Sequence, residues 1–143
     1  MNLGMTAFSA SACATSRSCA EGVFTDTARS NSVDPPARPQ VRRQRRVEVD
    51  FARVLPSAER ITLNLFPDVC VIAQRERMTD LGRGQVQWDG RVPGATPGTA
   101  TLVIDGALMV GTVRLGREVY EIRYLGEGVH MVTDVDLSKF PRD

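Results

Sequence analysis

The sequence is poor in the residues that most enzymes need. It contains one histidine in 143 residues, so a zinc-binding His-x-x-x-His pair is excluded. A histidine-based catalytic triad would have to rest on His130, which falls in a predicted strand and is interpreted as a structural or surface residue. The stretch LGRGQ (81–85) has two glycines, but neither a P-loop lysine nor a helix follows, so it predicts a turn. We therefore expect a protein that is not an enzyme and has no cofactor.

Cysteine is also scarce, and three residues do not indicate a disulfide framework. Cys13 and Cys19 lie near the start of the chain. Cys70 lies within an apolar run and is predicted to be a small buried hydrophobic residue, with a thiol that ligates a metal in a partner protein as the alternative.

Long apolar runs are missing as well. No segment approaches the roughly 18 apolar residues that a membrane-spanning helix requires. The opening MNLGMTAFSASACA has small residues near a potential cleavage point but lacks the basic and apolar regions of a secretory signal. A degenerate signal segment stays open as an alternative.

The first part of the chain differs in composition from the rest. Residues 1–45 hold many small polar residues, three closely spaced prolines and an excess of arginine, whereas the later residues are mildly acidic and richer in β-branched side chains. This contrast predicts a disordered leader over 1–45 and a β-rich domain over 46–143. The run RRQRR (42–46) is interpreted as a solvated linker. The alternatives are a nucleic-acid patch, which lacks interleaved aromatic residues, and a dibasic cleavage site.

Alternating apolar and polar residues recur throughout the predicted domain. They predict about eight short strands and no helix beyond one short turn between Asp134 and Phe140. Short links such as Asp105-Gly106 favour hairpins, so consecutive strands should pair as an antiparallel meander. A sheet this long must curl to bury one face, which predicts an all-β roll, sandwich or partial barrel. The expected strands cover residues 47–51, 60–66, 69–78, 85–92, 101–105, 107–115, 118–125 and 129–136.

Two acidic residues near the end of the chain are spaced as a pair. Asp134 and Asp136 stand two positions apart, which places them on one face of a strand. We interpret this face as exposed to solvent. A calcium site would require more oxygen ligands and a turning loop, and no metal site is predicted.

The order of several short motifs resembles a known family. The motifs are the strand LNLFPDV, a Trp-x-Gly turn at Trp88-Asp89-Gly90, an apolar strand with an Asp-Gly turn, a Tyr-Glu-Ile strand, and Gly-x-His followed by Asp-x-x-x-Phe-Pro. Over residues 46–141 the sequence is similar to the N-terminal propeptide domain of bacterial secreted zinc metalloproteases of the reprolysin-like type. The sequence ends at Asp143, where the family's linker to the catalytic domain would begin.

The resemblance implies a function without catalysis. Domains of this family keep a zinc metalloprotease latent and assist its folding, which implies a secreted or periplasmic location. The catalytic domain is the partner, in cis in the family and in trans or missing here. The contact residues implied are Asp136, Leu137 and Phe140, where the family's chain enters the protease; Phe140 could instead close one end of the core. The cysteine-switch role of related proteases is not transferred to Cys70.

A different class of function stays open. A β-rich module could bind carbohydrate or another surface through exposed aromatic side chains. The candidates for such a platform are Trp88, Tyr120 and Tyr124, of which Trp88 could equally belong to the core.

Overall fold

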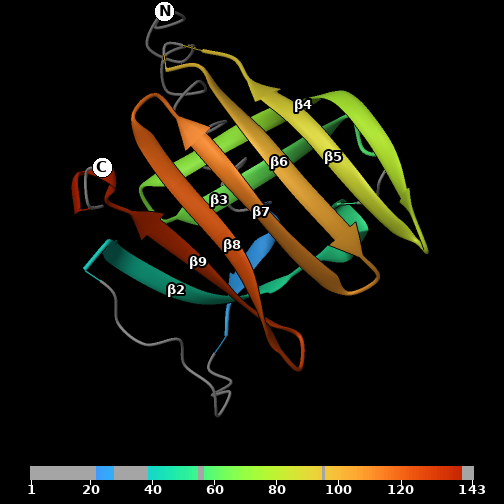
Figure 1. Cartoon of the computed structure of the whole chain (residues 1–143), viewed down its shortest axis with the longest axis horizontal. Helices are drawn as coiled ribbons and strands as arrows, with labels where there is room; N and C mark the ends of the chain where they lie inside the picture. Colours follow the sequence, from blue (N-terminus) through green and yellow to red (C-terminus); the bar gives the residue numbers. More distant parts are fainter. Residues whose placement is uncertain (1–21, 28–38, 55–56, 95, 140–143) are drawn as a thin grey trace, which may run out of the picture.

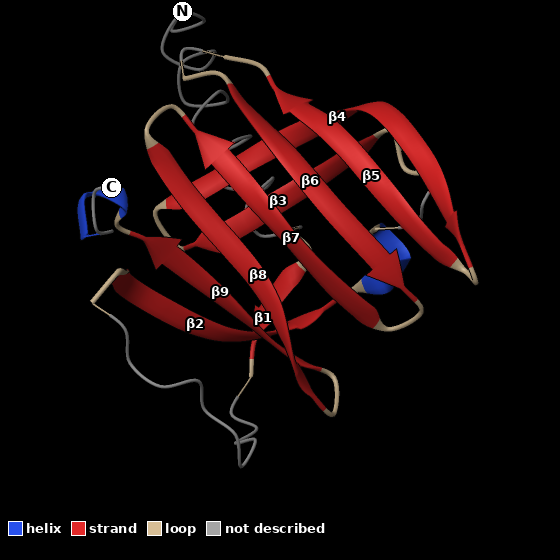
Figure 2. Cartoon of the chain, viewed as in Figure 1, coloured by secondary structure: helices blue, strands red, loops and turns tan. Residues whose placement is uncertain are grey.

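The chain forms one antiparallel β-sheet, seen here in a computed structural model (Figures 1 and 2). The structure describes residues 22–27, 39–54, 57–94 and 96–139. The strands are β1 (Phe24–Asp26), β2 (Val41–Val49), β3 (Arg60–Phe66), β4 (Val69–Gly82), β5 (Gln85–Val92), β6 (Gly98–Asp105), β7 (Leu108–Leu115), β8 (Glu118–Gly126) and β9 (Val129–Val135). Two short 3-10 turns are η1 (Phe51–Arg53) and η2 (Leu137–Lys139). The predicted all-β, antiparallel class is confirmed.

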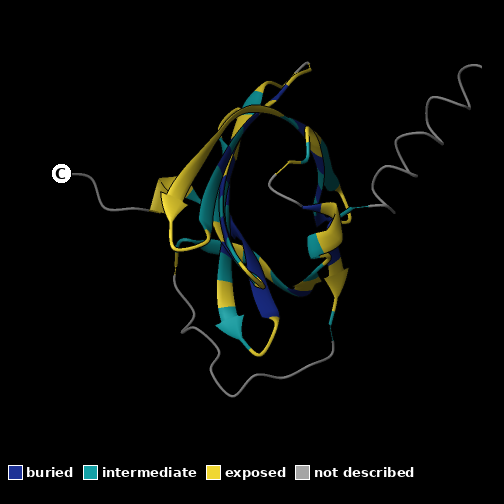
Figure 3. Cartoon of the chain, turned by 90° about the vertical axis from the view of Figure 1, so that its right-hand side faces the viewer, coloured by how far each residue is buried: buried dark blue, intermediate teal, exposed yellow. Residues whose placement is uncertain are grey.

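The strand order is β1-β2-β9-β8-β7-β6-β5-β4-β3. Strands β3 to β9 form the predicted meander, because the links between them are short. Gly106 and Gly116, in two of these links, both have φ near 60°, a conformation that glycine adopts without strain. The pairing of β2 with β9 joins the first two strands to the meander. The sheet then curves so that its two edge strands, β1 and β3, come close to each other. The result is a nearly closed, barrel-like sheet that curves around its buried residues (Figure 3).

The edge strands β1 and β3 meet at a seam. The Val23 N–H donates to the Thr62 carbonyl at 3.1 Å. The Asn64 side chain accepts from the Phe24 N–H at 2.9 Å and donates to the Phe24 carbonyl at 2.7 Å. Because one amide side chain offers both a donor and an acceptor, it pairs with the backbone of Phe24 much as a neighbouring strand would.

Trp88 is the largest fully buried side chain of the core. Its side chain is fully buried, and its indole N–H donates to the Ala58 carbonyl at 2.9 Å. The strand predicted over 85–92 is confirmed as β5, and the Trp-x-Gly motif, which the resemblance gave as a turn, lies within it. A Cβ atom at Gly90 would overlap the Trp88 ring, so the glycine leaves room for the indole to fold over the strand.

The strands begin earlier than the boundary predicted at residue 46. Strand β1 and the first residues of β2 lie within the segment interpreted as a leader. The interpretation of RRQRR as a solvated linker is wrong, because these residues are part of β2. In register, Arg43 pairs with Asp134, Arg45 with Val132, and Val47 with His130, so both arginines lie on the face that turns inward.

Arginine side chains bridge β2 to β3 where β1 does not extend. Arg45 donates to the Asn64 carbonyl at 2.7 Å and to the Asp26 carboxylate at 2.6 Å. The Arg43 guanidinium lies 4.0 Å from the centre of the Phe66 ring, within range of a cation–π contact. Charged side chains are tolerated on this inward face because each finds a carboxylate, a carbonyl or an aromatic ring.

Cys70 corrects a further prediction. It is only half-buried and is disulfide-bonded, rather than a small buried thiol. The other two cysteines of the chain, Cys13 and Cys19, lie outside the described residues. Cys70 faces outward because it pairs with Asn64, whose neighbours Leu63 and Leu65 point into the core. Within the described ranges no helix is long and apolar enough to cross a membrane.

Candidate partner-binding site at the end of the last strand

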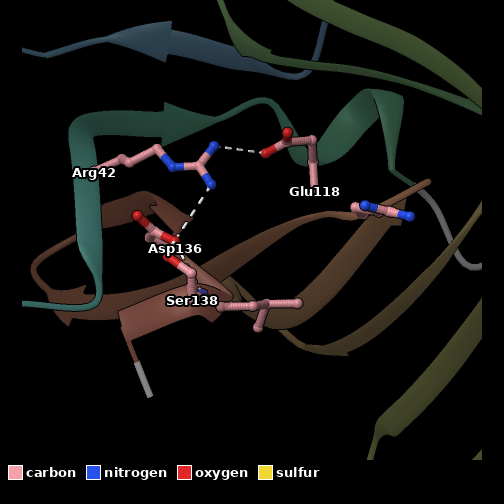
Figure 4. Close-up of a pocket in the computed structure, with 6 residues that line it drawn as sticks. Arg42, Glu118, Asp136 and Ser138 are labelled. Carbon is pink, nitrogen blue, oxygen red and sulfur yellow. Dashed lines mark hydrogen bonds and ion pairs between the residues drawn. The ribbon is translucent and has the colours of Figure 1, made fainter. Parts of the chain in front are cut away.

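An open pocket lies where the chain leaves β9. It has a volume of about 620 Å³ and is lined by Arg42, Arg117, Glu118, Asp136, Leu137 and Ser138. These residues come from the start of β2, from the β7–β8 turn with the start of β8, and from η2 with the residue before it. Figure 4 shows Arg42 reaching across from β2 between the carboxylates of Glu118 and Asp136. Residues far apart in sequence thus meet because β2 and β8 flank β9.

Arg42 organises the charges of this pocket. One guanidinium nitrogen lies 2.8 Å from Glu118, and the other lies 3.6 Å from Asp136. The first nitrogen is also 3.9 Å from an oxygen of Asp134. Arg117 lines the same pocket and has no ion pair with another described residue. The pocket therefore combines a satisfied ion-pair network with one cation available to a partner.

Asp136 fixes the direction in which the chain leaves the sheet. One of its carboxylate oxygens accepts from the Ser138 N–H at 3.0 Å and from the Ser138 hydroxyl at 2.6 Å. The Asp136 N–H donates to the Gln40 carbonyl at 2.6 Å. The hydrogen bonds from Ser138, assisted by Arg42, lower the pKa of Asp136 below its usual range. These contacts hold the carboxylate in its charged form and start the turn η2.

Leu137 is the apolar element of the pocket. Its side chain is 47 % exposed, the largest exposed fraction among the large hydrophobic residues of the described chain. Because Asp136 is held by Gln40 and Ser138, Leu137 is presented outward from a fixed turn. Of the three predicted contact residues, the structure brings Asp136 and Leu137 together in this pocket. Phe140 lies outside the described residues.

Sequence reasoning missed the arginines and the glutamate of this pocket. Arg42 was part of a noted basic run, but nothing local indicates that it meets Glu118, which lies 76 positions away. The pairing of β2 with β9 creates this neighbourhood. A long-range strand pairing cannot be deduced from alternation within either strand.

The prediction that Asp134 and Asp136 share a solvent-exposed face is wrong for Asp134. Its side chain is buried on the inward face, where one oxygen accepts from Arg43 at 3.1 Å. The other oxygen is buried without a hydrogen-bond partner. Burial, assisted by the charge of Asp134, raises the pKa of Tyr120. Alternation along β9 predicts which side chains share a face, but it does not show which face turns inward. Arg43 supplies the partner that makes the inward orientation of Asp134 possible.

The three candidate aromatic residues, all within the described part of the chain, do not form an exposed platform. Trp88 is fully buried and Tyr120 nearly so, whereas Tyr124 is 36 % exposed. Carbohydrate modules stack sugars on exposed rings, and two of the three candidate rings belong to the core. His130 is fully buried, as a structural histidine would be.

The pocket offers binding groups rather than a recognisable set of reactive groups. Within the described part of the chain, no three residues of the types His, Cys, Asp and Glu are grouped to hold a metal ion. An exposed leucine beside paired and unpaired charges is the mixture that protein interfaces use, with an apolar centre and a polar rim. In comparisons with known proteins, the chain matches no family model, no curated protein and no solved structure.

Proposed function

We propose that this protein is a non-catalytic module that keeps a zinc metalloprotease latent and assists its folding, as the propeptide domains it resembles do. The observation that carries the proposal is the fixed turn after β9, which presents Leu137 beside the charged groups of Arg42 and Arg117. The resemblance implies that the chain enters the protease at this end of the domain. A docking surface at that place is therefore what the proposal requires.

The physical basis of latency is exclusion of substrate. A rigid sheet that covers a cleft blocks access without any chemistry of its own. A tethered module acts at a high effective concentration, whereas a free one depends on its intrinsic affinity. The exposed Leu137 side chain would supply an apolar anchor, and Arg117 would pair with an acidic group on the rim of the protease.

The disulfide at Cys70 supports the proposed location. Disulfides form and persist in secreted and periplasmic proteins and are rare in the reducing cytosol. A protein that works beside a secreted protease would fold in the same oxidising compartment.

The test is a titration of the full chain into the catalytic domain of a reprolysin-like metalloprotease, with peptide hydrolysis as the readout. The proposal predicts saturable inhibition. Leu137→Glu should weaken it at least tenfold, because about 1.4 kcal/mol of apolar contact is replaced by a buried charge. Leu81→Glu is the matched control, since Leu81 is 46 % exposed but lies at the far end of β4. It should leave inhibition unchanged.

Two outcomes would count against the proposal. One is no inhibition by the folded chain at about 50 μM, a concentration at which even weak specific contacts are populated. The other is equal loss of inhibition in both leucine variants, which would mean that the pocket is not the contact surface. Refolding yield of the denatured protease, with and without the chain, tests the folding role separately.

A further inference from the structure

The only histidine of the chain occupies an unusual place in the core. His130 lies on the inward face of β9 and is fully buried. Its ring lies between the rings of Phe51 in η1 and Tyr124 in β8, at centroid distances of 5.9 and 5.0 Å. Three elements therefore converge on one imidazole at the end of the barrel-like sheet.

His130 replaces a missing strand contact. Strands β7 and β8 pair only from Gly111 onward, so Met109 lies before their ladder begins. The Met109 N–H donates instead to Nε2 of His130 at 3.1 Å, although β9 is two strands away from β7. Nε2 must therefore be unprotonated, which places the ring proton on Nδ1. Nδ1 is buried and has no partner with hydrogen-bonding geometry.

We propose that His130 is an acid-sensitive latch that holds the ends of β7, β8 and β9 together. Protonation of Nε2 would remove the acceptor for Met109 and place a cation among apolar rings. The β8–β9 turn is held by the same cluster, because the Gly128 N–H donates to the Tyr124 hydroxyl at 3.3 Å. Loss of the latch would release this end of the barrel while the seam at Asn64 stays intact.

No described carboxylate contacts the ring to stabilise its charged form. Asp50, the N-cap of η1, pairs with Arg53 at the surface at 3.1 Å. On β8, Glu121 lies near Arg123 on the outward face. The remaining acidic groups toward this end of the elements around the ring are Glu48 on β2, Asp105 before β7 and Glu127 in the β8–β9 turn. Asp105 accepts from Gln85, and the two glutamates are exposed. Glu118 and Asp134 lie toward the other end of β8 and β9, where the β2 arginines Arg42 and Arg43 pair with them.

Burial lowers the pKa of His130, and the nearby Gly128 backbone opposes this only in part. The unfolded chain has an ordinary histidine pKa of about 6.5. Above that pH the folded and unfolded states bind the same number of protons at this site. As the pH falls below the pKa of the unfolded state, His130 binds a proton in the unfolded chain but stays neutral in the folded one. The equilibrium for opening should therefore rise toward tenfold per pH unit until the folded pKa is reached.

The experiment uses the full chain and NMR between about pH 5 and 7, above the range in which ordinary carboxylates titrate. Since there is one histidine, its ring signals are unambiguous. We expect the folded ring to stay neutral at pH 6. Hydrogen-exchange protection at the amides of Met109 and Gly128 should fall as the pH is lowered. The control amide is Phe24 at the seam, whose protection should fall less.

His130→Gln keeps an acceptor but cannot titrate in this range. In this variant the protection of Met109 should no longer depend on pH between about 5 and 7. If the variant does not fold, the pH at which the His130 ring titrates in the unaltered protein still tests the proposal. A His130 ring that titrates near 6.5 in the folded state, with Met109 protection unchanged, would overturn the proposal. The same pH dependence in His130→Gln would also overturn it.

Discussion

The side chain of Asn64 binds both backbone groups of Phe24 across the seam of the sheet. It accepts from the Phe24 N–H at 2.9 Å and donates to the Phe24 carbonyl at 2.7 Å. The two residues lie 40 positions apart and belong to the two edge strands, β3 and β1. The Asn64 side chain thus occupies the backbone N–H and carbonyl of Phe24 on an edge strand, groups that could otherwise pair with another chain.

Replacement of Asn64 should weaken this closure. Asn64→Ala removes two hydrogen bonds and leaves the Phe24 groups without these partners, so we expect a loss of about 2 kcal/mol in the free energy of unfolding. Asn64→Asp keeps an acceptor but loses the donor to the Phe24 carbonyl. It should also destabilise the fold. Urea unfolding measures both changes, and values within error of the unaltered protein would show that the seam does not depend on Asn64.

Gly90 should resist substitution because of Trp88. A Cβ at position 90 would overlap the indole ring and approach the Gln74 carbonyl. We expect Gly90→Ala to cost about 1–3 kcal/mol through overpacking, with a shift in the fluorescence of the only tryptophan. In a Trp88→Leu background the added cost should shrink, because the smaller side chain leaves space. Equal costs in both backgrounds would assign the strain to the backbone alone.

The Arg43–Asp134 ion pair should contribute more to the free energy of unfolding than the more exposed Arg43–Asp68 pair. The side chain of Asp134 is 6 % exposed, whereas that of Asp68, the other partner of Arg43, is 66 % exposed. Asp134→Asn should destabilise the fold by about 2 kcal/mol, less than for a fully buried pair because Arg43 is partly exposed. Asp68→Asn should cost less than about 1 kcal/mol. Thermal unfolding of the two variants compares them directly, and a reversed order would contradict the burial argument.

The disulfide at Cys70 should stabilise the oxidised protein. A cross-link of this kind typically stabilises a folded protein by about 2–4 kcal/mol, because it restricts the unfolded chain. A reducing agent should lower the thermal midpoint of the unaltered protein. Cys70→Ser should have a midpoint as low as that of the reduced protein, and the reducing agent should not change it further. Three titratable thiols in the denatured, unreduced chain would show that no bond forms.

Local patterns in the sequence determined the strands of this protein. Alternation of apolar and polar residues depends only on neighbouring positions, so seven of the eight predicted strands and the hairpin at Asp105-Gly106 correspond to β3–β9 of the structure. The strand predicted over 47–51 covers only the end of β2, because the arginines that precede it gave no apolar alternation. Asp136 and Leu137 were placed near the end of the last strand by resemblance, and both line the pocket there. The short strand β1 was missed because three residues carry too little periodicity to detect.

The tertiary structure alone decided what the inward face holds and how the sheet closes. Arg43, Arg45 and Asp134 were expected to face solvent, since charge in isolation favours water. Pairing of β2 with β9, and the approach of β1 to β3, brings these groups carboxylates and carbonyls that no nearby residue provides. Sequence alternation fixes which side chains share a face, but only contacts between distant strands fix which face can accept a charge.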